Sequence, residues 1–502
     1  AEEEEEEEKD HSMAASDGGP AMSRVLEGVA RGERQPLAWL QDSAASRGEK
    51  LASAEFAKSL DELFVGHPSY QREAFHIPLA GNYGKTSKEV AQPGAEAVYL
   101  CGHSLGLQPR RTRELISEEL DKWAKVGVEG HFTGERPWVA IDEFCKTKSA
   151  EVVGAKESEV AIMNGLTVNL HLLFVAFYKP QGKRCKIMYE SDAFPSDFHA
   201  FESQAHFHGL DPKEVLVALK PREGESLLRQ DDVLAAIEVA GDTLAILVIP
   251  TVQYYTGQYF DVPALTAAGH KVGAAVLAQC AHSAGNVNLR LHDWGVDGAC
   301  WCSYKYLNSG PGSIAGFFIH ERHHEKVAGM PKLAGWWGHK KDTRFDMAHV
   351  MHPCPGAAAF QLCNPPVLEM VSLLASLDVF VQPGMCLLRG RSLLLTCYLE
   401  QTLREELGSG DVGFVLITPS EVDRRGSMLC LKFDSDERCV AIFEEVAKRG
   451  VIIDYRKPAV LRVTPVPLYN SFTDIYRFGQ ALQAAVVATR AADNGAKRQK
   501  VA

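Results

Sequence analysis

Short, continuous apolar segments alternate with helical segments from about residue 98 to residue 320, and this alternation constrains the fold more than any other feature. Strands that are buried on both faces of a sheet read as continuous apolar runs, and helices between them are the usual crossovers of parallel strands. The sequence therefore predicts an α/β fold with a mainly parallel sheet. The expected strands are VYLC, KIMYE, LAILVIP, AAVLAQCA, ACWCSYKY and IAGFFI.

The rest of the chain suggests further divisions. The run Glu2 to Glu8 is too densely charged to pack, so we expect an acidic, disordered tail. The segments FVLIT, MLCLKF and LRVTPV are expected strands, and they predict a smaller C-terminal α+β domain. The expected divisions are a disordered tail over 1–42, a helical segment over 43–97, a large domain over 98–380, a small domain over 381–490 and a disordered tail over 491–502.

Composition narrows the class of protein. The chain has 502 residues, of which 46% are hydrophobic, enough for a large buried core. A formal net charge of −12 argues against nucleic acid as a partner. The 12 cysteines form no CxxC pair. Since the acidic start shows no apolar region and no apolar run approaches about 20 residues, we expect neither a secretory signal nor a membrane span. We expect a cytoplasmic protein without a membrane partner.

Two motifs suggest other enzyme classes. GHSLG, from Gly102 to Gly106, matches the nucleophile elbow of serine hydrolases, but an elbow needs a helix that starts at Ser104. Pro109 instead indicates a later helix start. HERHH, from His320 to His324, matches the zinc motif H-E-x-x-H, but it follows a predicted strand and lacks a third ligand. We therefore expect no metal.

Lys305 is the residue best placed for covalent chemistry. It lies at the end of an apolar segment and before the small-residue loop of Ser309 to Ser313. A desolvated lysine amine can condense with a carbonyl group. Leu166 and Thr167 begin a predicted helix after a small-residue turn, which suits a phosphate, and Phe194 could stack on an aromatic ring.

Together these motifs resemble the kynureninase family. The matching segments run in family order from about Tyr99 to Ser471 and include YLCGHSLGLQP, MNGLTVNLHLL, AFPSD, AHSAGNV, CWCSYKYLN and TPVPLYNS. The resemblance implies an aspartate-aminotransferase-like fold (PLP fold type I), a homodimer and pyridoxal 5'-phosphate (PLP) bound in the large domain. It also implies hydrolysis of L-kynurenine or 3-hydroxykynurenine to anthranilate or 3-hydroxyanthranilate and L-alanine, in tryptophan catabolism.

The resemblance also implies roles for individual residues. Lys305 matches the Schiff-base lysine, and Tyr304 or a nearby group would be the general acid or base. The implied cofactor-binding residues are Leu166, Thr167, Phe194, Ser196, Asp197, Gln279, His282, Tyr304, Lys305, Trp336 and Asn364. The implied substrate-binding residues are Ser104, His131, Asn364 and Arg462, of which Arg462 matches the arginine that binds the α-carboxylate.

The chain departs from the family at several implied site positions. Gln279 stands where the family has an aspartate that pairs with the protonated pyridine nitrogen, and Pro250 stands where it has a serine. Gln253, His103 and Asp192 replace a family histidine, asparagine and, in some members, lysine. Three hypotheses stay open: a kynureninase-type hydrolase, a catalytically impaired PLP-binding paralogue, and a serine hydrolase built on GHSLG.

Overall fold

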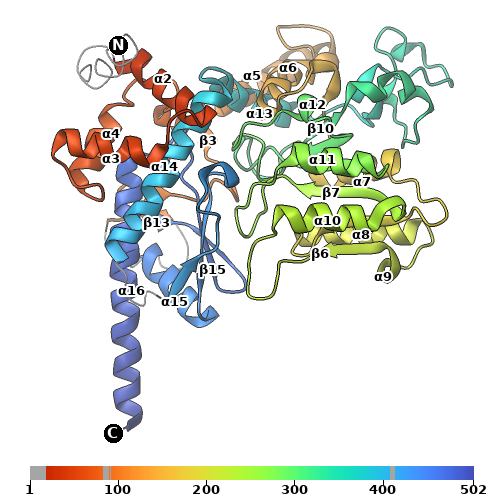
Figure 1. The fold of residues 1–502 in the computed structure, drawn as a ribbon. Coiled ribbons are helices and arrows are strands. Elements are labelled where there is room, and N and C mark those ends of the chain that lie inside the picture. The colour runs from red at the N-terminus through yellow and green to blue at the C-terminus, as the bar shows by residue number, and fades with distance from the viewer. Residues whose placement is uncertain (1–17, 83–89, 91, 408–412, 502) are drawn as a thin grey trace, which may run out of the picture. The chain divides into compact units, whose positions relative to one another are not determined.

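The computed structural model describes residues 18–82, 90, 92–407 and 413–501 and divides the chain into two compact units (Figure 1). Unit 1 comprises Ala1–Ser104 and Gln382–Ala502, and unit 2 comprises Leu105–Val381. The N-terminal segment therefore belongs to the same unit as the C-terminal domain. Residues 98–104, which we expected in the large domain, belong to unit 1 because β2 (Val98–Tyr99) pairs in parallel with β13 (Val451–Ile452).

The core of unit 2 is a seven-stranded sheet with the order β4-β10-β9-β8-β7-β5-β6. Strands β6, β5, β7, β8 and β9 are parallel, whereas β10 is antiparallel to both of its neighbours. The predicted, mainly parallel sheet is thus confirmed. Its strands are β4 Val160–Ile162, β5 Lys186–Glu190, β6 Leu216–Leu219, β7 Leu244–Pro250, β8 Ala275–Gln279, β9 Gly298–Trp301 and β10 Gly316–Ile319.

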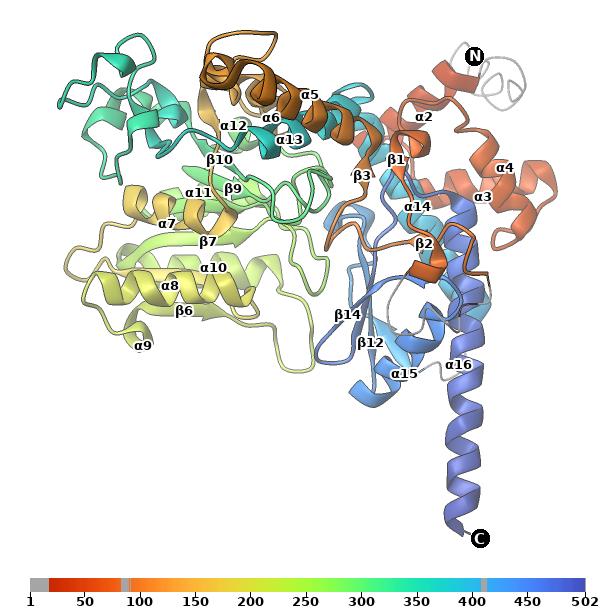
Figure 2. The ribbon, with the colours of Figure 1, turned by 180° about the vertical axis from the view of Figure 1, so that it is seen from behind.

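Helices cover both faces of this sheet. Helices α10 (Gln230–Ala240) and α11 (Val262–Lys271) lie in front of it in Figure 1, and α7 (Leu166–Phe177) and α8 (Pro195–Phe207) lie in front in the reverse view of Figure 2. Most of α7 is apolar, and its buried side chains join the core of the unit. The other elements of unit 2 are β3 Gln108–Pro109, α5 Arg110–Val126, α6 Glu143–Val153, α9 Pro212–Val215, α12 Leu291–Trp294 and α13 Val367–Val381.

Unit 1 contains a four-stranded antiparallel sheet with the order β11-β12-β15-β14. This agrees with the α+β architecture expected of the C-terminal part. Its strands and helices, besides β2 and β13, are α2 Gly18–Arg31, α3 Pro36–Arg47, α4 Ala54–Glu62, β1 Phe75–His76, α14 Gly384–Leu407, β11 Phe414–Leu416, β12 Leu429–Phe433, α15 Asp436–Ala447, β14 Asp454–Arg456, β15 Val460–Val463 and α16 Phe472–Val501.

Both expected tails need correction. Residues 18–42 are not a disordered tail, because they form α2 and most of α3, and Leu26 and Leu40 are fully buried in the core of unit 1. The acidic run led us to extend the expected tail too far, although Met22, Val25, Leu26 and Val29 have the apolar spacing of a helix. Likewise, α16 extends through most of the expected tail at 491–502. The acidic run itself lies outside the described residues.

None of the described helices is, by itself, long and apolar enough to span a membrane. Among the helices of the described residues, α13 and α14 satisfy that criterion only when taken together, by length and composition alone.

Candidate active site

A pocket opens in unit 2 at the carboxyl ends of the parallel strands. Glu190 ends β5, Pro250 ends β7 and Gln279 ends β8, and Lys305 follows β9 by four residues. Ligands of parallel α/β sheets usually bind at this edge. The pocket holds about 790 Å³ of space, including the part open to solvent. It is lined by Leu166, Thr167, Tyr189, Glu190, Ala193, Phe194, Ser196, Asp197, Phe201, Val248, Pro250, Val252, Tyr254, Gln279, Ala281, His282, Cys302, Tyr304 and Lys305.

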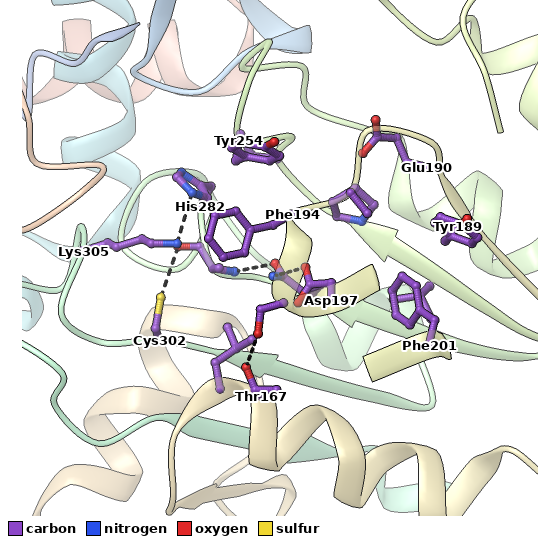
Figure 3. Close-up of a pocket in the computed structure, with 18 of the residues that line it drawn as sticks. Thr167, Tyr189, Glu190, Phe194, Asp197, Phe201, Tyr254, His282, Cys302 and Lys305 are labelled. Carbon is purple, nitrogen blue, oxygen red and sulfur yellow. Dashed lines mark hydrogen bonds between the residues drawn. The ribbon is translucent and has the colours of Figure 1, made fainter. Parts of the chain in front are cut away.

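The amino ends of two helices meet at one side of this pocket. Helix α7 starts at Leu166, as the sequence predicted, and α8 starts at Pro195. Thr167 and Ser196, in the first turns, are hydrogen-bonded through their hydroxyl groups at 2.8 Å (Figure 3). Neither N-cap residue has a side chain that caps the helix. The first-turn N–H groups, the helix dipoles and two hydroxyl groups therefore suit an anion such as a phosphate.

Lys305 has three polar neighbours. Its Nζ lies 3.1 Å from Nε2 of His282 and 5.8 Å from the centroid of the Tyr304 ring. The thiol of Cys302 hydrogen-bonds to both Tyr304 and Lys305. Burial raises the pKa of Cys302 and raises the pKa of Tyr304 to about 12, so both groups stay protonated at neutral pH. The Lys305 amine is thus held inside the pocket, where it can meet a carbonyl carbon.

Asp197 is a buried carboxylate in the same pocket. Gln279 Nε2 donates a hydrogen bond to its Oδ2 at 2.8 Å, and Gln279 Oε1 accepts one from the backbone N–H of Ala281 at 3.0 Å. The other carboxylate oxygen, Oδ1, is buried and has no hydrogen-bond partner among the described residues. Burial raises the pKa of Asp197 to about 6, although the charge of Lys305 and the bond from Gln279 act in the opposite direction.

Glu190 is a second buried carboxylate, which is held by the protein itself. The backbone N–H of Asp192 donates to its Oε1 at 2.8 Å, and the Gln253 amide lies 3.4 Å from its Oε2. Burial raises the pKa of Glu190 to about 7. The Gln253 carbonyl accepts hydrogen bonds from the N–H groups of Tyr255 and Thr256, so Gln253 also stabilises the turn after β7.

Aromatic rings border the space between Lys305 and Asp197. Figure 3 shows Phe194 between these two residues, with Thr167 below. The ring of Phe194 contacts Tyr254 edge-on, with centroids 5.3 Å apart, and the Tyr254 ring lies 6.4 Å from that of His282. The pocket therefore offers flat surfaces to a planar ring.

Nine of the residues implied by the sequence meet in this pocket, and the others lie elsewhere. His131 and Trp336 belong to a partly exposed aromatic cluster of unit 2, in which Phe132 and Phe345 connect their rings. Neither residue lines the Lys305 pocket, nor does the exposed Asn364. Ser104 and Arg462 belong to unit 1.

Arg462 is fully buried on β15. Its Nε and Nη2 both donate to Oδ1 of Asp454, at 2.9 and 2.8 Å, so Asp454 fixes the orientation of the guanidinium.

Several lining residues were not singled out by the sequence, among them Glu190, Tyr254 and Cys302. A signal existed for each. Glu190 ends the predicted strand KIMYE, Tyr254 lies in YYTGQ, a further segment that resembles the family, and Cys302 precedes Lys305 by three residues.

The structure also explains the two misleading motifs. Helix α5 begins at Arg110, six residues after Ser104, so GHSLG does not form a nucleophile elbow. In HERHH, His320 caps a 3-10 helix by accepting from the N–H of Arg322, and His323 bonds to Asp297. His324 bonds to the carbonyl of Ile319, so each histidine has a structural partner.

Comparisons with known proteins give a consistent result. Residues 388–482 match the family model for the kynureninase C-terminal domain. A kynureninase from Flavobacterium johnsoniae is 49% identical over 433 residues, 86% of this chain and 98% of the relative. A kynureninase from Mus musculus is 48% identical over 415 residues, 82% of this chain and 89% of the relative.

A solved cysteine desulfurase from Escherichia coli has a TM-score of 0.63 and 16% identity, and it covers 78% of this chain and 95% of that chain. At this identity the likeness shows the fold alone, and it confirms the expected aspartate-aminotransferase-like fold.

Proposed function

The chain belongs to the kynureninase family, and from this premise we propose that it hydrolyses the Cβ–Cγ bond of L-kynurenine or 3-hydroxykynurenine. The products are anthranilate or 3-hydroxyanthranilate and L-alanine, and the cofactor is PLP held at Lys305. The observation that carries this proposal is the position of the Lys305 amine, in one pocket with two helix amino ends and a buried carboxylate.

The residues of the pocket fit PLP. The phosphate would be held by the first turns of α7 and α8 with Thr167 and Ser196, and the ring would stack against Phe194. The buried Oδ1 of Asp197, which no described residue satisfies, offers an acceptor to a donor on the ring. When bound, PLP supplies an electrophilic carbon and a ring that withdraws electrons from the α-carbon of the substrate.

The protein's own groups would handle the protons. Lys305 would hold the cofactor through its amine, and the same amine, when free, would act as the base for the α-proton of the substrate. His282, 3.1 Å from Lys305 Nζ, would orient the amine. Tyr304, whose pKa is raised by burial to about 12, would donate a proton rather than accept one at neutral pH. A water molecule would add to the γ-carbonyl carbon, and the Cβ–Cγ bond would then break. Cγ would leave as the carboxylate of the anthranilate product, and Cβ would take up a proton to become the methyl group of L-alanine.

Arg462 would bind the α-carboxylate of the substrate. Asp454 holds the Arg462 guanidinium in a fixed orientation, and a planar guanidinium suits the recognition of a carboxylate.

We further propose that the protein is a homodimer. Phe132, Trp336 and Phe345 are each about half exposed, and their rings form one contiguous cluster, which is typical of an interaction surface. A second copy could cover this surface. The 12 cysteines are all free, which suits a reducing compartment such as the cytoplasm.

Turnover of both substrates tests this function. Purified protein with added PLP should release anthranilate from L-kynurenine, or 3-hydroxyanthranilate from its hydroxylated form, with one L-alanine for each. Lys305→Ala should lose this activity while keeping its melting temperature. If the PLP-loaded protein cleaves neither substrate, the proposed hydrolase activity is wrong, and the hypothesis of a catalytically impaired PLP-binding paralogue is favoured.

A further inference from the structure

The two ends of the pocket define where each end of a bound pyridine ring must lie. The aldehyde carbon of PLP and its ring nitrogen are para to each other. A ring that is joined to Lys305 therefore presents its nitrogen to the side of the pocket away from that lysine. Figure 3 shows Lys305 at one side of Phe194 and Asp197 at the other.

Gln279, at the end of β8, cannot supply a charge to that nitrogen. Its amide N–H donates to Asp197, and its carbonyl accepts from the backbone of Ala281. The side chain is thus used to position a neighbour. It holds Oδ2 of Asp197 and leaves Oδ1 buried without a partner among the described residues.

Glu190 is the other buried carboxylate of the pocket, and it is a poorer candidate. The Asp192 N–H and the Gln253 amide already bond to it. Asp197, in contrast, interacts electrostatically with Lys305 across the pocket.

We infer that Asp197, on the first turn of α8, is the anionic partner of the pyridine nitrogen in this chain, with Gln279 as its positioning residue. This inference rests on the proposed function. The family's own aspartate at position 279 is absent here, so the charge comes from a helix instead of a strand end. A carboxylate opposite the nitrogen keeps the ring protonated, which strengthens electron withdrawal. The glutamine at position 279 therefore does not by itself prevent electron withdrawal by a protonated pyridine ring.

An analogue that lacks the nitrogen tests this directly. Dissociation constants of the apoprotein are measured for PLP and for 1-deaza-PLP, in which a C–H replaces the ring nitrogen. Both carry the aldehyde and the phosphate. We expect the wild-type protein to bind PLP about 10- to 100-fold more tightly, the range for one charge-assisted hydrogen bond.

Three variants assign that preference to a residue. Asp197→Asn should reduce it to about threefold or less, and Gln279→Leu, which removes the donor to Asp197, should reduce it partly. Glu190→Gln is the matched control, a second buried carboxylate of the same pocket, and should keep the preference. Melting temperatures of the apoproteins check folding.

Each outcome has a distinct meaning. Equal affinities of the wild-type protein for the two ligands overturn the inference without any variant, as does a preference that survives Asp197→Asn or disappears in Glu190→Gln. If the wild-type protein binds neither ligand, the cofactor assignment of the proposed function fails first.

Discussion

At the scale of single residues, Arg462 carries the proposal for substrate binding. Arg462→Ala should lower kcat/KM, mostly by raising KM. The corresponding loss of transition-state stabilisation should be about 2–5 kcal/mol, because a buried charge-assisted pair with the substrate is lost. PLP affinity should be unchanged. Arg456→Ala is the control, since Arg456 is a neighbouring cation that also contacts Asp454, at 3.4 Å. Steady-state kinetics and PLP titration decide the matter, and equal losses of substrate and PLP binding would show a structural role instead.

The sequence predicted which residues line the pocket better than it predicted the hydrogen bonds between them. Leu166, Thr167 and Lys305 could be found because helix starts and lysines after apolar strands have local signals. The bond between Gln279 and Asp197 could not, since it joins residues 82 positions apart and depends on how β8 and α8 pack. For the same reason Gln279 suggested a lost charge, whereas the structure places a carboxylate beside it.

At the scale of elements, Asp297 connects three parts of unit 2. It precedes β9 and bonds to His270 on α11 and to Arg322 and His323 in the segment after β10. Burial alone would raise the pKa of Asp297, but the bonds from the histidines and the charge of Arg322 outweigh it, so the pKa lies well below its usual range. The ion cluster therefore stabilises the fold above the ordinary aspartate pKa of about 4 and loses this contribution as pH falls further.

Asp297→Asn should accordingly lower the free energy of unfolding at neutral pH by about 3–5 kcal/mol, the cost of breaking a buried ion pair. Denaturant titrations measure it, and the difference from wild type should shrink in acid. Asp293→Asn, at an exposed position nearby, should change stability by less than about 0.5 kcal/mol. A neutral effect of Asp297→Asn at pH 7 would contradict this account.

Elements with one dominant periodicity were predictable. The strands KIMYE and LAILVIP end where expected, at Glu190 and Pro250, because continuous apolar runs identify doubly covered strands. Helix α2 was missed because the acidic run before it dominated the composition, although its buried Leu26 and Val29 have helical spacing. The pairing of β2 with β13 is a long-range contact, which no local pattern reveals.

At the scale of the whole molecule, the exposed aromatic cluster tests the proposed dimer. A double variant, Phe132→Asp with Phe345→Asp, should shift the mass from two chains to one in light scattering and reduce turnover, because buried charges disfavour an apolar interface. Val239→Asp is the control, a hydrophobic residue that is 88% exposed on α10. A wild-type protein that is monomeric at micromolar concentration would refute the dimer.

The proposed function depends above all on a cofactor bound at Lys305, and reductive labelling shows which lysine holds it. The PLP-loaded protein is treated with borohydride and digested, and the peptides are analysed by mass spectrometry. We expect one phosphopyridoxyl group per chain, on Lys305, and none in Lys305→Ala. A label on another lysine, or no label on a protein that has bound PLP, would contradict it.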